Sequence, residues 1–259
     1  MRSRLNIEHA LAYLMWGVET LSRRDCSLIL TGARVCNSEQ RLTHLLARWE
    51  QRRLIVRHGR GAQARFTITA EGRQRIAVTD PTRHWNEPWD GKWRVFNYDL
   101  PETRRTERIL LWRALHDRKL GLLQRSMWVW PHEVEPMLRE IIQAQGIPEC
   151  FCGFRSEALF LCSDMEVVNV AWDWEEIRRR HQTYQQHLTA NVDSLKRAAD
   201  LPALARVARI ERDAYQYAFS LDALLPRSLW PSPYAGPRME ARHQEFLAVL
   251  SRRARELST

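Results

Sequence analysis

The feature that most constrains this fold is a change in the spacing of apolar residues near residue 53. Before it, apolar residues recur at intervals of three and four, which is typical of amphipathic helices packed on one side. After it, two short runs alternate between apolar and polar residues, and they flank a turn that contains Gly59 and Gly61. Two such runs around a glycine-containing turn predict a β-hairpin.

The capping signal before this change predicts where the last of these helices begins. Asn37 is a good N-cap, and Gln40 follows three residues later, which is a capping-box pattern. Together with the apolar spacing, the pattern predicts a helix from about Ser38 to Arg52. An earlier helix is predicted over residues 6–22, and a shorter helical or irregular stretch over residues 25–30.

The order of these elements is that of a winged helix-turn-helix. The hairpin strands are predicted over residues 54–57 and 65–69, directly after the capped helix. In this type of module the capped helix enters the major groove of DNA by its N-terminal end, and the hairpin lies against the backbone or the minor groove. The alternative interpretation is a protein-interaction module, because winged helices also serve in that role.

The basic excess of the chain is concentrated in the same segment. The net charge is +9, and residues 1–80 hold 14 Lys and Arg against 7 Asp and Glu, whereas residues 81–165 hold 12 against 12. Residues 166–259 hold 14 against 12. Of the 40 basic residues 37 are arginine, a ratio that genome composition alone can produce. The local imbalance is not explained in that way, and it indicates a nucleic-acid partner for residues 1–80.

The predicted DNA-binding residues lie on the capped helix and on the hairpin. Polar and basic side chains near the start of the helix are suited to base edges or phosphates, and arginines on the hairpin are suited to the DNA backbone. The candidates are Ser38, Gln40, Arg41, Thr43, His44, Arg48 and Arg52 on the helix, and Arg57, Arg60 and Arg65 on the hairpin.

The middle of the chain predicts a small mixed domain after a linker. Residues 81–91 contain two prolines and little periodicity, and residues 92–165 read as β-α-β-α-β, which suggests a ferredoxin-like α+β domain. The expected elements are strand Trp93–Tyr98, helix Arg104–Leu115, strand Met127–Pro131, helix Glu133–Gln145 and strand Ala158–Leu161.

Residues 166–259 predict a helical C-terminal domain. Apolar residues follow helical spacing from Ile177 to about Ala199, from Pro202 to Phe219, and again near the end of the chain. Together the segments predict an α+β protein with a winged helix-turn-helix domain in residues 1–80, a ferredoxin-like domain in residues 92–165 and this helical domain.

Two runs in the middle domain and one near the C-terminus resemble a known family. Trp93-Arg94-Val95-Phe96-Asn97-Tyr98-Asp99-Leu100-Pro101 and Leu120-Gly121-Leu122-Leu123-Gln124-Arg125-Ser126-Met127-Trp128-Val129 resemble the central domain of PaaX-type regulators, repressors named for phenylacetic acid catabolism. That domain is similar to the small CRISPR-associated adaptation nuclease, whose first strand also ends in Tyr-Asp. Ser220–Pro226 followed by Leu229-Trp230-Pro231 resembles the C-terminal signature of the same regulators.

The resemblance implies a dimeric transcriptional repressor of three parts. It implies that the central domain helps to form the homodimer and that an acyl-CoA effector releases the DNA. Because such a homodimer presents two winged helices, we expect it to bind an inverted-repeat operator. No residue pattern in this sequence independently indicates a CoA pocket, so the effector-binding residues are unknown. Because no Gly-rich phosphate loop of the Walker or Rossmann kind is present, we expect no cofactor.

The enzymatic alternative is a metal-dependent nuclease that uses Asp99. Paired aspartates at a strand end of a symmetric dimer are suited to holding a divalent metal for phosphodiester cleavage. The simpler interpretation is that Asp99 caps the following turn, a common role at such positions. Glu102 is near in sequence, but no second acidic residue has an obvious ligand spacing. The prediction is therefore a regulator and not an enzyme.

The cysteines and the apolar runs predict a cytoplasmic protein. The five cysteines include no CxxC pair, which disfavours a zinc site or a disulfide framework. Cys150, Cys152 and Cys162 are expected to be buried, unreactive thiols. No run of eighteen apolar residues is present and no apolar region follows the first two arginines, so neither a membrane span nor a secretory signal is expected.

Overall fold

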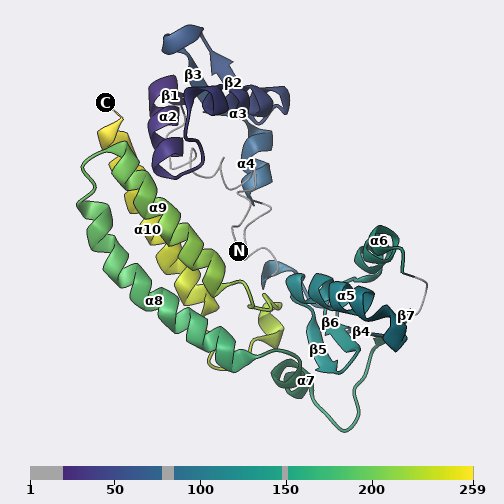
Figure 1. The fold of residues 1–259 in the computed structure, drawn as a ribbon. Helices are drawn as coiled ribbons and strands as arrows, with labels where there is room; N and C mark the ends of the chain where they lie inside the picture. The colour runs from purple at the N-terminus through teal and green to yellow at the C-terminus, as the bar shows by residue number, and fades with distance from the viewer. Residues whose placement is uncertain (1–19, 78–84, 148–150, 259) are drawn as a thin grey trace. The chain divides into compact units, whose positions relative to one another are not determined.

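The computed structural model describes residues 20–77, 85–147 and 151–258, and it divides the chain into two compact units (Figure 1). The first unit comprises Met1–Asp80, His181–Ala218 and Gly236–Thr259. The second comprises Pro81–Arg180 and Phe219–Ala235. The predicted α+β class is confirmed, because helices and two antiparallel sheets alternate along the chain.

The N-terminal part of the first unit has the order of a winged helix. Its sheet has the strand order β1-β3-β2, with antiparallel neighbours, and Ile55 pairs with Ile68 across the hairpin. The elements are β1 (Thr20–Ser22), α2 (Arg23–Gly32), α3 (Glu39–Gln51), β2 (Ile55–His58), the 3₁₀ turn η1 (Gly61–Gln63), β3 (Arg65–Ile68) and α4 (Ala70–Ala77).

Two predictions for this part need correction. Residues 6–19 of the predicted first helix lie outside the described residues, but Thr20–Ser22 form a strand that pairs with β3 and not the end of a helix. The N-cap of α3 is Ser38 and not Asn37: Ser38 has an extended backbone, and its Oγ accepts a hydrogen bond from the amide of Arg41 at 3.3 Å. The helix consequently begins one residue later than the predicted start at Ser38.

The C-terminal helices share a core with the winged helix. α9 (Leu201–Ala218) and α10 (Gly236–Leu257) lie beside α8 (Trp174–Lys196), whose residues from His181 onward belong to this unit (Figure 1). A Cβ on Gly32 would lie 2.5 Å from the carbonyl oxygen of Pro202 and 2.9 Å from the Cβ of Ala205. α2 therefore contacts α9 at a distance that only glycine allows.

A buried polar network joins these three helices. Glu211 of α9 is 1% exposed, and it accepts a hydrogen bond from the hydroxyl of Tyr184. The Nδ1 of His243 lies 3.2 Å from Glu211 Oε1, the Nε2 of His187 lies 3.4 Å from Oε2, and the Asn191 amide donates to Oε2 at 3.5 Å. Burial, with Glu211 next to it, raises the pKa of Tyr184 far above its usual value, so this hydroxyl stays a donor.

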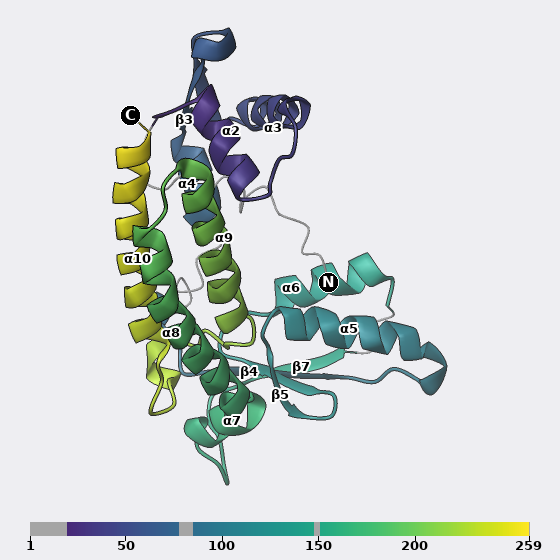
Figure 2. The same ribbon diagram turned by 60° about the vertical axis from the view of Figure 1, so that its left-hand side comes forward.

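The second unit contains a four-stranded antiparallel sheet of ferredoxin-like topology. The strand order is β5-β6-β4-β7, and α5 and α6 cover one face of the sheet (Figure 2). Phe96 and Tyr98 of β4 pack under these helices, while Trp93 packs on the other face with α7. The elements are β4 (Trp93–Tyr98), η3 (Glu102–Arg104), α5 (Arg105–Asp117), β5 (Gly121–Gln124), β6 (Met127–Trp130), α6 (Glu135–Gln145), β7 (Phe151–Ser156), α7 (Asp164–Ala171) and η4 (Arg227–Leu229).

The last predicted strand of this sheet is wrong. Residues 158–161 form no regular structure, and the strand that completes the sheet is Phe151–Ser156, which pairs with β4. β7 is an edge strand with mostly exposed side chains, so it lacks the apolar alternation by which a half-buried strand is found. The short strand Gly121–Gln124 was also missing from the predicted order β-α-β-α-β.

The second unit also contains a lysine that is costly to bury. The Nζ of Lys119 donates to the carbonyl oxygen of Phe219 at 2.6 Å, and burial lowers the pKa of Lys119 to about 8 although Asp222 acts in the opposite direction. Between pH 8 and the ordinary lysine value, the unfolded chain therefore binds more protons at this site than the folded chain does.

We expect the free energy of unfolding of the second unit to rise with pH in that window, by about 1–3 kcal/mol from this group. Urea unfolding of the wild-type chain and of Lys119→Met at pH 7, 8, 9 and 10 measures the contribution, since the methionine variant has no titrating group there. Equal slopes against pH in the two proteins would contradict the assignment.

Candidate nucleic-acid interface

α3 presents a line of arginines on its exposed side. Leu42, Leu45, Leu46 and Trp49 of this helix are buried. Arg41, Arg48 and Arg52 are exposed, and their spacing of seven and four places them along one flank of the helix. Gln40 and His44 are exposed beside them. The sequence therefore correctly separated the polar face of α3 from its buried face, and these five candidates share one surface.

Two other candidates on α3 have partners inside the protein. Ser38 is the N-cap. The hydroxyl of Thr43 donates to the carbonyl oxygen of Glu39 at 2.8 Å and accepts a hydrogen bond from Arg23 at 2.7 Å. Arg23 also pairs with the Glu39 carboxylate at 3.1 Å, and Ser27 donates to the same carboxylate at 3.2 Å. Thr43 thus holds α3 against α2, a role that sequence reasoning missed because Arg23 is twenty residues away.

The hairpin carries the other three candidates. It extends away from the helices of its unit, and α3 lies beside its base (Figure 1). Arg57 is paired with Glu50 of α3 at 3.0 Å. Arg60 and Arg65 are exposed, and among the described residues their guanidinium groups have no hydrogen bond or ion pair. The tip between them is a turn in which Gly59 and Gly61 have positive φ angles of 80° and 61°.

The surface formed by α3 and the hairpin is strongly basic. Residues 38–65 contain seven arginines and two glutamates. Both glutamates are already paired, Glu39 with Arg23 and Glu50 with Arg57. Arg53, which follows the C-cap of α3 and was not among the candidates, is also exposed. The remaining arginines have no ion pair in the described ranges, and together they create a positive potential that attracts a polyanion.

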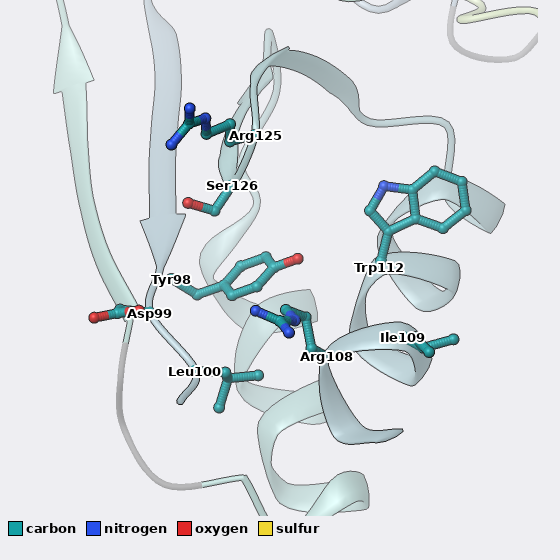
Figure 3. Close-up of a pocket in the computed structure, with 8 residues that line it drawn as sticks. All are labelled: Tyr98, Asp99, Leu100, Arg108, Ile109, Trp112, Arg125 and Ser126. Atoms are coloured by element: carbon teal, nitrogen blue, oxygen red, sulfur yellow. The ribbon is translucent and has the colours of Figure 1, made fainter. Parts of the chain in front are cut away.

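The alternative site, Asp99, borders a pocket of about 510 Å³ in the second unit (Figure 3). Asp99 is exposed at the end of β4, and its carboxylate points away from the ring of Tyr98. It is the one carboxylate among the eight lining residues, which include Arg108 and Arg125. Nearby Glu102 is paired with Arg108 through two hydrogen bonds of 2.9 and 2.8 Å. No cluster of three metal-ligating side chains occurs among the described residues.

The cysteines are free thiols in two different environments. Cys26 and Cys36 are buried, and burial raises the pKa of Cys26 to about 12. Cys152 and Cys162 are exposed. The prediction that these two are buried is wrong, because β7 is an edge strand and Cys162 lies in the loop that follows it. Cys150 lies outside the described residues.

The fold defines a class of protein in which a winged helix with a basic surface is joined to a Cas2-like sheet domain. Residues 86–168 match the family described as the PaaX protein central Cas2-like domain. This match confirms the predicted resemblance to PaaX-type regulators, and it shows that this part of the chain is similar to their central domain.

Comparison with solved structures shows the same arrangement of elements in an uncharacterized protein from Mycobacterium tuberculosis, Rv0674. The TM-score is 0.57 with 16% sequence identity, and the match covers 96% of each chain. At this identity the likeness concerns the fold alone. No curated protein matches the chain. None of the helices in the described part of the chain is long and apolar enough to span a bilayer.

Proposed function

We propose that this protein is a sequence-specific DNA-binding transcriptional regulator of the PaaX type, and that it acts as a repressor. The observation that carries the proposal is the exposed flank of Arg41, Arg48 and Arg52 on α3, next to a hairpin whose Arg60 and Arg65 have no partner within the described part of the chain. The match of residues 86–168 to the PaaX central domain supports the regulatory class.

In the proposed complex the N-terminal half of α3 enters the major groove. Gln40, Arg41 and His44 then reach base edges, where the arginine fork is suited to the O6 and N7 atoms of guanine. Arg48 and Arg52, further along the same flank, bind phosphates. The hydrogen bond between Thr43 and Arg23 joins α3 to α2, and Ser38 caps the start of α3, which supports a role for both residues in positioning this helix.

We further propose that the active species is a homodimer on an inverted repeat. A two-fold symmetric protein presents two α3 helices, and their half-sites then lie about one helical turn of DNA, roughly 34 Å, or a multiple of it apart. The central Cas2-like domain supplies the dimer contact in this proposal. A small-molecule effector would lower the affinity for DNA by favouring a dimer geometry in which the two helices no longer match that spacing.

The test is a titration of the DNA upstream of the protein's own coding region against random-sequence DNA of equal length. It is carried out at several salt concentrations, because phosphate contacts alone give salt-dependent binding without sequence preference. Tighter binding to the upstream DNA at every salt concentration is expected. Equal affinity for both DNAs at all of them would exclude sequence-specific regulation at that site.

The hairpin arginines carry a separate prediction. In the variant Arg60→Ala/Arg65→Ala we expect the slope of log K against log salt to become shallower by about 2, since each lost phosphate contact removes about 0.9. The preference for upstream over random DNA should change little. Arg206→Ala, an exposed arginine of α9, is the control and should leave the slope unchanged. An unaltered slope in the hairpin variant would show that the hairpin does not touch DNA.

A further inference from the structure

The loop after β7 exposes two large apolar side chains. Phe160 is 85% exposed and Leu161 is 97% exposed. Leu161 also has a φ of 64°, in the left-handed region that leucine rarely adopts. Two adjacent large apolar side chains that are almost fully exposed form a surface on which a partner can pack.

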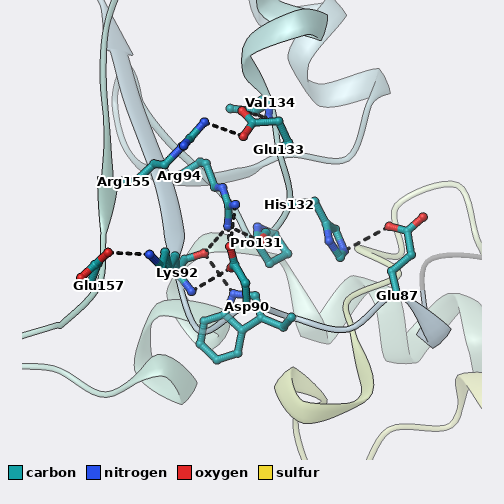
Figure 4. Close-up of polar contacts among 11 residues, drawn as sticks. Glu87, Asp90, Lys92, Arg94, Pro131, His132, Glu133, Val134, Arg155 and Glu157 are labelled. Atoms are coloured by element: carbon teal, nitrogen blue, oxygen red, sulfur yellow. Dashed lines mark hydrogen bonds and ion pairs between the residues drawn. The ribbon is translucent and has the colours of Figure 1, made fainter.

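The loop is held at both ends, so these two side chains are presented in a defined position. Ser156 Oγ donates to the carbonyl oxygen of Ala158 at 2.8 Å, and Glu157 pairs with Lys92 at 2.5 Å (Figure 4). Leu159 packs against the core on the α7 face of the sheet. At the other end, Ser163 is the N-cap of α7 in a capping box. Phe160 and Leu161 thus lie at the tip of an anchored loop.

A groove of about 600 Å³ lies beside the strand that leads into this loop. It lies along β7 and α6, and its lining includes Phe96, Leu138, Ile142 and Phe151. Gly153 opens its floor, since a Cβ there would lie 3.3 Å from the Cβ of Phe96. Within the described chain β7 pairs with β4 and with no second strand, so its outer backbone edge is open.

The charges around the groove are already neutralised. Arg155 pairs with Glu133 at 2.7 Å (Figure 4), and Arg139 pairs with Glu135 at 2.7 Å. Arg94 donates to the carboxylate of Asp90 through two bonds of 2.7 Å. An apolar segment therefore meets a rim without unpaired charge, which suits an uncharged loop tip better than a charged peptide.

We propose that Phe160 and Leu161 of one copy occupy this groove in a second copy of the chain. The proposal rests on the homodimer proposed above and names its contact. A two-fold axis forms the contact twice, because each copy then gives its loop and receives the loop of the other. Burying a phenylalanine removes about 150–250 Å². Two reciprocal insertions, with the leucines and the groove walls they cover, reach about 1,000 Å², the lower bound for a specific interface.

The test is sedimentation equilibrium of the full chain and of Phe160→Ser/Leu161→Ser. Both side chains are exposed, so the fold should be retained, and we expect the dimer dissociation constant to rise at least tenfold. Val170→Ser, which removes an apolar side chain that is 64% exposed on α7, is the matched control and should dimerise like the wild type. An unchanged dimer in the loop variant would overturn this inference and leave the homodimer intact, whereas a monomeric wild-type chain at all concentrations would overturn both.

A second measurement identifies the occupant of the groove. Phe160 is replaced by the photo-crosslinking analogue p-benzoylphenylalanine, and unlabelled protein is mixed with ¹⁵N-labelled protein before irradiation. We expect cross-links that join position 160 of one chain to residues 133–142 or 151–155 of another chain, so that one linked peptide is ¹⁵N-labelled and the other is not. Cross-links to these residues only within one chain would show that the loop folds back on its own groove, and cross-links to neither would also contradict the proposal.

Discussion

Replacing Arg41 and Arg48 together with alanine is expected to weaken binding to the upstream DNA about 100-fold. Each arginine contributes about 1–3 kcal/mol when it contacts a base edge or a phosphate in a well-formed complex, and 1.4 kcal/mol corresponds to a factor of ten. Both side chains are exposed on α3, and neither guanidinium has a hydrogen bond or ion pair among the described residues. The melting temperature of the free protein should therefore be unchanged.

The two arginines are expected to act differently. Arg41 is in the first turn of α3, so Arg41→Lys should keep the phosphate attraction but lose the bidentate pairing with guanine, and the preference for upstream over random DNA should fall. Arg48→Lys should bind nearly like the wild type, because a phosphate accepts either cation. Fluorescence anisotropy with both DNAs measures these differences. If the double alanine variant binds DNA like the wild type, α3 is not the helix that enters the major groove.

The second large effect is expected at Glu211, which is far along the chain from α3. Glu211→Leu should lower the free energy of unfolding of the first unit by about 3 kcal/mol, because Tyr184 and Asn191 lose the carboxylate that accepts their hydrogen bonds in a buried site. For a chain of this size the melting temperature should fall by roughly 6–12 °C. Calorimetry and urea unfolding measure both quantities.

Two variants serve as controls for this prediction. Glu245→Leu removes an exposed carboxylate from α10 and should change stability by less than about 0.5 kcal/mol. Glu211→Gln keeps an acceptor for Tyr184 and should have an intermediate effect. A more stable Glu211→Leu variant would mean that the desolvation of the carboxylate outweighs its hydrogen bonds, as happens in some buried ionic networks.

The Glu211 network also bears on DNA binding. α9 carries Glu211 and contacts α2 at Gly32, and one apolar core includes residues of α2, α3, α9 and α10. Loosening the three C-terminal helices should therefore lower the stability of the surface that carries Arg41. We expect Glu211→Leu to bind DNA normally well below its melting temperature and to lose binding as it unfolds.

The elements that sequence reasoning predicted correctly are those with local signals. α3 follows from apolar spacing and a cap, the β2–β3 hairpin from alternation around two glycines, and β4, α5 and α6 from period and turn residues. In each of these elements, the residues that determine the helix or strand are close together in the sequence. The polar flank of α3 was predictable for the same reason, since a helix places residues three and four apart on one side.

The predictions were wrong where residues distant in the chain determine the local structure. The apolar run 158–161 has strand composition but pairs with no strand among the residues that the structure describes, whereas the mostly exposed Phe151–Ser156 pairs with β4 along its whole length. Thr20–Ser22 form a strand because β3, more than forty residues later, offers hydrogen-bonding partners. Likewise, Thr43 is a predicted DNA-binding residue by its place on α3, but its hydroxyl accepts a hydrogen bond from Arg23, twenty residues earlier in the chain.

Periodicity, capping and charge in the sequence are enough to predict a basic winged helix with arginines on one face of a capped helix, followed by a neutral ferredoxin-like domain similar to the PaaX central domain. Three features emerge only from the folded chain: which of those polar residues have partners within the protein, the core that the C-terminal helices share with the winged helix, and the exposure of Phe160 and Leu161. Periodicity and capping act over a few residues, whereas burial and pairing depend on surfaces from distant parts of the chain.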